Sequence, residues 1–313
     1  MVIDCHVHVS ALLPGHGSMS RRLFESAPFR FMRSRLGIEG CDGQTERLLE
    51  AKLVRTIAET PALDAAVVLA FDAVHDLDGR FDSAKTHLYV TNDYVIELVA
   101  RNPKMRFGAS VHPYRNDAVA ELERCVKAGA VLLKWLPPTQ GMNPANPKCF
   151  PFYEALVHFG LPLLCHTGGE KSLPRVDDSL ADPRLLEPAL KMGVTVIMAH
   201  CGTRSALNEP DFLDEFTRLA RTYPNCYGDT AALNLPMREH AYALLHDKDV
   251  REKLIHGSDW PIIAIPPASK LSVAQFARCM TDPNWLRRDI TIKQMVGFDD
   301  AYWHRAEKVL RLG

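Results

Sequence analysis

The sequence lacks the cysteine patterns that indicate a disulfide framework or a structural zinc site. Its eight cysteines include no Cys-x-x-Cys pair, which is the usual spacing in zinc-binding and redox motifs. Several of them, such as Cys5 and Cys165, lie inside apolar runs that resemble strands, where the geometry of a disulfide bond is hard to meet. We therefore expect reduced, buried cysteines in a cytoplasmic protein.

Long apolar runs and an excess of one charge are also absent. No apolar stretch reaches the roughly 18 residues that a membrane span requires, and we expect no signal peptide because the first predicted strand starts at residue 2. The 37 basic residues nearly balance the 38 acidic ones. This balance argues against nucleic acid or an anionic membrane surface as a partner, so we expect a small-molecule substrate.

The first strand carries two histidines on one face. Residues 1–9 are rich in β-branched side chains, which favours a strand over a helix. Side chains alternate between the two faces of a strand, so His6 and His8 point the same way. Two parallel imidazoles at one strand end make half a metal site. A single His-x-His pair remains weak evidence until further ligands are found.

Short apolar runs alternate with amphipathic segments from residue 65 onward. Near-continuous apolar runs are typical of strands that are covered on both faces. With the first strand they make eight, the others being 65–71, 105–111, 130–136, 161–166, 194–200, 226–229 and 254–259. Helical periodicity predicts helices at 92–101, 118–128, 152–159, 182–192, 211–222 and 237–246. This order predicts an α/β fold, a (β/α)₈ TIM barrel.

Two segments lie outside the repeating pattern. Residues 10–60 form a polar insertion after the first strand, with helices predicted at 20–35 and 44–59. So long a connection indicates a lid or specificity element. The tail, residues 269–313, adds two or three helices that we expect outside the barrel. No repeat or interdomain linker separates these parts, so we predict a single domain over residues 1–313.

Every predicted strand ends in an ionisable residue. In a TIM barrel the functional side chains project from the carboxyl ends of the strands, so these groups should share one rim. Packing has no use for so many desolvated polar groups, whereas a divalent metal ion does. The residues at these ends are His6, His8, Asp72, His112, Lys134, His166, His200, Asp229 and Asp259.

Four short motifs follow one another at these strand ends. They are Asp4-Cys-His6-Val-His8, Leu164-Cys-His166-Thr-Gly-Gly169, Met198-Ala-His200-Cys-Gly202 and His256-Gly-Ser-Asp259-Trp-Pro261. In combination they resemble the amidohydrolase superfamily, in particular its amidohydrolase-related branch of metal-dependent TIM-barrel hydrolases. The resemblance implies a catalytic metal held by His6, His8, His166 and Asp259.

The same resemblance implies roles for three catalytic residues. His200 would orient or activate the attacking water or stabilise charge on the substrate, and Asp259 would be both ligand and general base. Lys134, if carboxylated, would bridge two metal ions as in the two-metal members; otherwise it would be a cation that binds an anionic substrate group. A third interpretation places Lys134 merely along apolar groups at the top of the barrel. We favour one divalent ion over two and expect it to be Zn²⁺.

Further polar residues have more than one interpretation. Asp4 is either an acceptor for a ligand imidazole or a structural residue of the barrel floor, and Asp229 is a candidate acceptor for His200 or Asp259. Asp72 and His112 are candidates for substrate contact. The arginines of the insertion suit a solvated helix face better than a carboxylate clamp; they include Arg21, Arg22, Arg33 and Arg35.

These features predict a metal-dependent hydrolase of a small amide, ester or lactone. The alternative is a metal-dependent, non-oxidative decarboxylase of an aromatic or unsaturated carboxylic acid, which uses nearly the same ligands in this family. The intact His-x-His motif with Asp259 favours hydrolysis. A barrel that binds a metal without turnover is a third interpretation, and the assembly state, a homodimer included, stays open.

Overall fold

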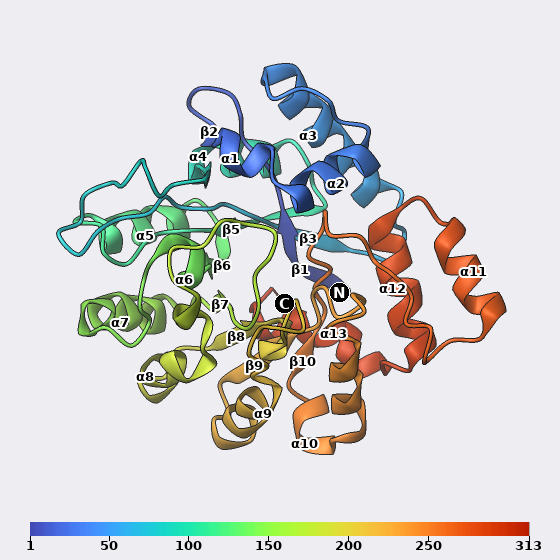
Figure 1. The fold of residues 1–313 in the computed structure, drawn as a ribbon. Coiled ribbons are helices and arrows are strands. Elements are labelled where there is room, and N and C mark those ends of the chain that lie inside the picture. The colour runs from blue at the N-terminus through green and yellow to red at the C-terminus, as the bar shows by residue number, and fades with distance from the viewer. Residues whose placement is uncertain (313) are drawn as a thin grey trace.

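Eight parallel strands form the centre of the structure, and helices surround them (Figure 1). The computed structural model describes residues 1–312. The strands follow chain order around a single sheet and are β1 (Ile3–His8), β3 (Ala65–Leu69), β5 (Met105–Ala109), β6 (Ala130–Trp135), β7 (Leu163–His166), β8 (Val196–Ala199), β9 (Cys226–Asp229) and β10 (Leu254–Ile255).

The sheet closes between β1 and the segment that follows β10. Cys5 donates its backbone N–H to the carbonyl of His256 at 3.0 Å, and His8 donates to Trp260 at 2.8 Å. Val7 also forms a parallel bridge with Trp260. Closure of eight parallel strands confirms the predicted (β/α)₈ TIM barrel. The observed strands are mostly shorter than predicted, since several predicted strand ends belong to the loops that carry the polar residues.

Helices between the strands form the outer ring. The α-helices are α4 (Asn92–Ala100), α5 (Ala118–Lys127), α6 (Pro137–Gln140), α7 (Phe150–Phe159), α8 (Glu187–Lys191), α9 (Leu213–Thr222) and α10 (Lys248–Arg251). The 3₁₀ helices are η1 (Pro147–Cys149), η2 (Asp178–Ala181), η3 (Pro183–Leu186), η4 (His200–Gly202) and η5 (Glu239–His246). The predicted helix 182–192 divides into η3 and α8, because Pro183 and Pro188 each lack a backbone donor. The predicted helix 237–246 is η5.

The insertion contains three helices and one short strand. The helices are α1 (Arg21–Phe24), α2 (Ala27–Leu36) and α3 (Gly43–Ala58). The single helix predicted at 20–35 is wrong, because Ser26 caps α2 and Pro28 stands in its first turn. Strand β2 (Gly17–Met19) pairs antiparallel with β4 (Leu88–Val90), a pairing that the sequence did not indicate.

The tail forms three helices that reach both the barrel and the insertion. They are α11 (Val273–Thr281), α12 (Trp285–Val296) and α13 (Asp300–Val309). Helix α13 packs against β1 and β10, and α12 packs against α3. Asn284, which caps α12, donates from Nδ2 to the carbonyl of Thr56 at 2.9 Å and to Thr60 Oγ1 at 3.1 Å. The tail therefore braces the insertion.

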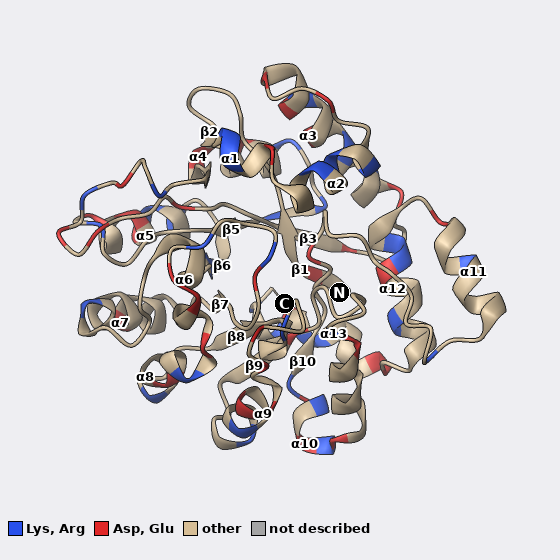
Figure 2. Cartoon of the chain, in the orientation of Figure 1, with Lys and Arg blue, Asp and Glu red and all other residues tan. Residues whose placement is uncertain are grey.

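The distribution of charged residues and the state of the cysteines can be compared with what the composition predicts. Acidic and basic residues are mixed on most of the outer helices, whereas α1 and α2 carry arginines and no acidic residue (Figure 2). All eight cysteines are free, and all except the exposed Cys41 are buried. Across residues 1–312, every helix is too short or too polar to cross a lipid bilayer.

Candidate metal centre

Three potential ligand atoms meet where β1 ends and the loop after β10 begins. His6 Nε2 and His8 Nε2 lie 3.1 Å apart. Asp259 Oδ1 lies 3.4 Å from His6 Nε2 and 3.2 Å from His8 Nε2. Within residues 1–312 this is the one group of three His, Cys, Asp or Glu side chains whose donor atoms all lie within 4.8 Å of one another. The structure thus brings together three of the four metal ligands predicted from the sequence.

Asp229, at the end of β9, holds His6 in one orientation. Its Oδ2 accepts a hydrogen bond from His6 Nδ1 at 2.7 Å, and its Oδ1 accepts from the backbone N–H groups of His200 and Ala231. The proton on Nδ1 leaves the lone pair of His6 on Nε2, the atom that faces His8 and Asp259. The side-chain partner of Asp229 is therefore the imidazole of His6, and neither His200 nor Asp259, the two candidates that the sequence suggested.

Protonation of these groups also suits cation binding. Burial lowers the pKa of His6 well below its usual value, and the nearby charge of Lys134 lowers it further, so the ring is neutral. Burial alone would raise the pKa of Asp259, but His6, His8 and Lys134 outweigh it and hold this pKa below its usual value. Neutral imidazoles and an ionised carboxylate are the forms that ligate a metal.

Asp4 has a structural role. Its Oδ1 accepts from the backbone N–H of His6 at 3.1 Å and from that of Ser258 at 2.9 Å. These bonds tie β1 to the loop that carries Asp259. Burial raises the pKa of Asp4 to about 7. Of the two roles that the sequence left open, the structure supports the positioning of the backbone.

Lys134, near the end of β6, reaches the same centre. Its Nζ lies 3.0 Å from His6 Nε2, and the side chain is fully buried. Burial lowers the pKa of Lys134, while the charges of Asp229 and Asp259 act in the opposite direction. The side chain does not merely pass apolar groups, because its amine ends among the candidate ligands.

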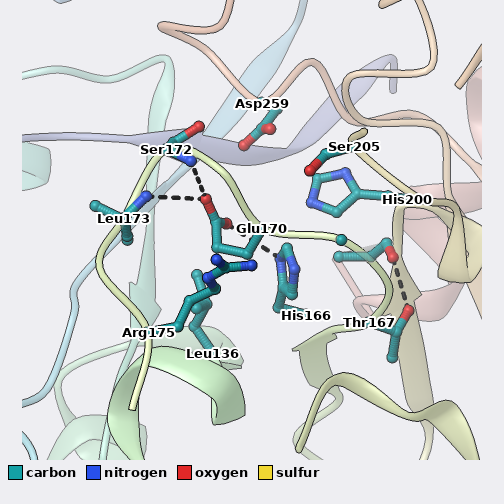
Figure 3. Close-up of polar contacts among 12 residues, drawn as sticks. Leu136, His166, Thr167, Glu170, Ser172, Leu173, Arg175, His200, Ser205 and Asp259 are labelled. Carbon is teal, nitrogen blue, oxygen red and sulfur yellow. Dashed lines mark hydrogen bonds and ion pairs between the residues drawn. The ribbon is translucent and has the colours of Figure 1, made fainter. Parts of the chain in front are cut away.

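His166, the fourth predicted ligand, lines the same cavity but lies outside the three-residue group. Its Nδ1 is 3.8 Å from Glu170 Oε2, and Glu170 is held by the backbone N–H groups of Ser172 and Leu173 (Figure 3). His166 Nε2 is buried and has no hydrogen-bond partner among residues 1–312. A buried nitrogen of this kind needs a partner, which a metal ion or a substrate atom can supply.

His200 is held in a defined tautomer. Its Nδ1 contacts the carbonyl of Ala231 at 2.8 Å; because a carbonyl only accepts, the proton must be on Nδ1. Burial lowers the pKa of His200 well below its usual value, so the ring is neutral and Nε2 is an acceptor. Its ring centroid lies 5.3 Å from that of His6 and 5.0 Å from that of His166. His200 is therefore suited to accept a proton or a hydrogen bond.

Backbone strain is concentrated at two of these residues. His200 has φ 60° and Asp259 has φ 66°, both in the left-handed region that non-glycine residues rarely adopt. Such a conformation costs about 1 to 3 kcal/mol and is retained mainly where the surrounding structure and the function require it. The strain supports a functional role for both side chains.

The donor set fits a divalent metal ion. Two imidazole nitrogens and one carboxylate oxygen are ligands that catalytic zinc takes in proteins. Donors about 2.0–2.1 Å from a tetrahedral ion lie about 3.3 Å from one another, and the three separations here are 3.1, 3.2 and 3.4 Å. The residues His6, His8 and Asp259 can therefore hold one ion with little movement, with His166 beside them.

The insertion forms part of the wall of the cavity above these groups. Phe29 and Met32 of α2 line it, together with Leu173 and Ile262 from two barrel loops. Sequence reasoning placed the insertion over the site but identified none of these four side chains. Amphipathic spacing marks Phe29 as a buried residue of its helix, yet it does not say which cavity the residue faces.

Arg238 and Gly168 are further residues that the sequence analysis missed. Arg238, the residue before η5, is buried and donates to the carbonyls of Thr203 and Gly169, which joins the loops after β7 and β8. Gly168 has φ 81°, and a Cβ there would lie 2.3 Å from the carbonyl of Thr203. The Gly-Gly pair after His166 therefore permits a close backbone approach.

Two predicted substrate contacts are wrong, since neither Asp72 nor His112 lines the metal cavity. Asp72 Oδ2 accepts from the backbone N–H of His112 at 2.7 Å and from Arg115 at 3.1 Å. His112 Nε2 in turn contacts the carbonyl of Gln140 at 3.0 Å. These residues support one another and hold a loop in place.

The insertion arginines do not clamp a substrate in this cavity. Arg21 is exposed and pairs with Glu25. Arg33 lies over the ring of Phe24, and Arg35 lies over the ring of Phe31. Arg22 lines a separate, polar groove. The interpretation as a solvated helix face is therefore the better one.

The substitution Asp229→Asn is expected to weaken zinc binding about 10- to 100-fold, because the amide is a poorer acceptor for His6 Nδ1–H than the carboxylate. Competition with a chelating dye measures the affinity. Asp214→Asn, on α9, is the matched control and should bind zinc as the wild type does. Equal affinities for wild type and Asp229→Asn would contradict the role given to this carboxylate.

A buried ion pair supports the loop that carries Asp259. Lys293 Nζ lies 2.6 Å from Asp289 Oδ2 and donates to the carbonyl of Gly257 at 2.7 Å. Burial raises the pKa of Asp289 to about 6, and Lys293 partly offsets this effect. Both residues are on α12, so the tail also helps to position the site.

Lys293→Met is expected to lower the free energy of unfolding by about 3 kcal/mol, because it leaves Asp289 buried without its cation. Urea unfolding measures the change. The exposed Lys270→Met is the control and should unfold within about 0.5 kcal/mol of the wild type. A similarly small effect for Lys293→Met would show that the pair contributes little.

Comparison with known proteins agrees with the fold and the motifs. A family model described as amidohydrolase matches residues 3–287. A TIM-barrel protein of Bordetella bronchiseptica without an assigned function has a TM-score of 0.64 at 14% identity, with 99% of this chain and 98% of that chain covered. No curated protein matches the chain.

Two further structures resemble it over nearly their whole length. A probable 2-pyrone-4,6-dicarboxylic acid hydrolase of Acinetobacter baumannii has a TM-score of 0.57 at 17% identity, covering 99% of this chain and 95% of that chain. A 2,6-dihydroxybenzoate decarboxylase has a TM-score of 0.58 at 13% identity, covering 99% and 98%. These similarities show the fold, and the family match over most of the chain shows that this protein is an enzyme that belongs to the amidohydrolase family.

Proposed function

We propose that this protein is a metal-dependent hydrolase of a small amide, ester or lactone. The observation that carries the proposal is the convergence of His6, His8 and Asp259 beside a cavity. Two imidazoles and a carboxylate leave further coordination positions open, as catalytic sites require. Zn²⁺ is the proposed ion, because this mixture of nitrogen and oxygen donors suits it.

Asp259, His200 and Lys134 have different roles in the proposed reaction. A bound divalent ion polarises a carbonyl group and lowers the pKa of water. Asp259, an ionised carboxylate at the centre, takes the proton of the attacking water. His200 presents Nε2 as an acceptor, so it orients that water and does not donate to the substrate. Lys134 places a cation where negative charge develops on the substrate.

One ion is proposed in preference to two. A second ion would require Lys134 to carry a carboxylated amine, with His166 and His200 as further ligands. His166 Nε2 is free of hydrogen bonds to residues 1–312, and His200 directs its Nδ1, not its Nε2, to the carbonyl of Ala231. Both Nε2 atoms are therefore candidates for ligation of a second ion. The intact mass of the protein distinguishes the two cases, because carboxylation adds the mass of CO₂ to Lys134.

Hydrolysis and decarboxylation both occur among the similar structures. One is that of a probable 2-pyrone-4,6-dicarboxylic acid hydrolase, and another is that of a 2,6-dihydroxybenzoate decarboxylase. We favour hydrolysis for this chain, because Asp259 and His200 are both placed as acceptors for a water proton.

The test uses zinc-loaded enzyme, a panel of small esters, lactones, amides and aromatic carboxylic acids, and ¹⁸O-labelled water. Hydrolysis predicts one ¹⁸O atom in the acid product and no release of CO₂. Asp259→Asn is the control for background hydrolysis. Release of CO₂ without ¹⁸O in the organic product would instead establish decarboxylation, and no turnover of any compound would contradict both.

A further inference from the structure

A second cavity adjoins the metal cavity. The two share Phe29, Met32, Ser172, Pro261 and Ile262 as lining residues, so they lie side by side. The part beside the ligands has a volume of about 80 Å³, and the adjoining part has about 170 Å³. The second cavity therefore offers space for a substrate group that extends from the reacting atoms past these shared residues.

Three separate segments build most of the walls of this second cavity, and Ser172 and Leu235 complete them. Helix α2 supplies Phe29 and Met32, the loop after β10 supplies Ile262 and Ile263, and the first residue of α12 is Trp285. Its walls include no charged side chain, and Ser172 is the one polar lining residue within residues 1–312. Phe29 and Trp285 are 8% and 9% exposed, so their positions are set by packing and the surface is already assembled.

We propose that this cavity is the subsite for an uncharged, hydrophobic substituent of the substrate, an alkyl chain or aryl ring attached to the group that reacts at the metal centre. The assignment rests on the proposed hydrolase function. Burial of apolar surface against such walls is favourable, whereas a carboxylate placed there would lose its hydration without a counter-charge. The substrate class is therefore a hydrophobic ester, amide or lactone.

A polar groove on the other side of Glu170 provides a poorer site for an anionic substituent. Lys171 and Arg175 line it, but Glu209 pairs with them at 3.1 and 3.2 Å. Arg175 also pairs with Asp178 at 3.0 Å. Arg22 also lines the groove, but so do the carboxylates of Glu170 and Asp177. Because cations and carboxylates balance there, the groove offers little net attraction to a further anion, and the apolar cavity is the better subsite.

The experiment compares three carboxylate probes by calorimetry on the zinc-loaded full chain. Butanoate, hexanoate and adipate differ in chain length and in the charge at the far end. Hexanoate is expected to bind about tenfold more tightly than butanoate, because it buries two additional methylene groups. Adipate is expected to bind no more tightly than butanoate, because its second carboxylate would enter the apolar cavity. Equal binding of butanoate and hexanoate, or tightest binding of adipate, would overturn the assignment.

Substitutions that fill the cavity locate the effect. Ile263→Phe, and independently Leu235→Phe, should reduce hexanoate affinity about tenfold, so that it no longer exceeds the affinity for butanoate. Val157→Phe, on the exposed face of α7, is the matched control and should retain the wild-type ratio of affinities. A retained ratio in both filled variants would place the hydrophobic group elsewhere.

This test separates the subsite from the hydrolase activity, because binding is measured without turnover. A preference for hexanoate in a protein that hydrolyses nothing would contradict the proposed function and support the subsite. Hydrolysis of small esters without any preference for hexanoate would support the function and contradict the subsite.

Discussion

Asp259→Asn is expected to lower kcat for ester or lactone hydrolysis by at least about 10³-fold. The carboxylate lies 3.2 Å from His8 Nε2 and 3.4 Å from His6 Nε2, and its low pKa keeps it ionised. An amide can neither accept the proton of the attacking water nor supply negative charge to a cation. Steady-state kinetics on the zinc-loaded variant measure the loss.

The matched control is Asp178→Asn, which changes an exposed carboxylate in η2. Its kcat should stay within about twofold of the wild type, since its charge is screened by solvent. Circular dichroism of Asp259→Asn should match that of the wild type. A folded Asp259→Asn variant with more than a tenth of the wild-type kcat would contradict the role of Asp259 as general base.

His8→Ala is expected to weaken zinc binding more than about 100-fold, beyond the effect of losing an outer partner. The substitution removes one of the three donors, and catalytic zinc sites use three protein ligands, so the two that remain are too few. His8 is preferred to His6 for this test because its side chain is 24% exposed, whereas that of His6 is buried and bonded to Asp229. The variant should therefore fold as the wild type does.

Dialysis against a chelating buffer followed by elemental analysis measures the retained metal. His158→Ala, on the exposed part of α7, is the matched control and should retain the wild-type amount. Thermal melts in the presence and absence of zinc supply a second readout, because an ion that binds only the folded protein raises its Tm. Unchanged zinc retention by His8→Ala would remove His8 from the ligand set.

The barrel and the centre of the site could be predicted because both depend on local sequence patterns. Strand alternation places His6 and His8 on one face, and parallel strands bring Asp229 and Asp259 to the same rim. The eight predicted strands correspond to the eight observed, although several end one to four residues early in the structure. Periodicity locates an element, but the turn chemistry at its end decides the boundary.

The lid and the apolar subsite could not be predicted in the same way. Phe29 and Trp285 are far apart in the sequence, and only the packing of α12 against the insertion brings them to one cavity. Arg238 likewise resembles a surface residue of a predicted helix, yet it is buried against the loops after β7 and β8. Such tertiary contacts have no local signal.

The hydrogen-bond partners of individual polar side chains could not be predicted from local sequence patterns either. Asp229 bonds the ring of His6 because His200 directs its own Nδ1 to the carbonyl of Ala231. Asp72 and His112 end their strands as the site residues do, but they bond each other and lie outside the metal cavity. Position near a strand end therefore does not by itself assign a residue to the site.

The central claim is that His6, His8 and Asp259 hold one catalytic divalent ion. Its most direct test is the number of metal atoms per chain in the purified enzyme, measured by elemental analysis alongside intact mass and turnover. We predict one zinc atom per chain, no added mass on Lys134, and loss of both metal and turnover on treatment with a chelator. Full turnover by a protein with no metal would contradict the claim, and two atoms per chain with added mass on Lys134 would replace it with a bridged pair.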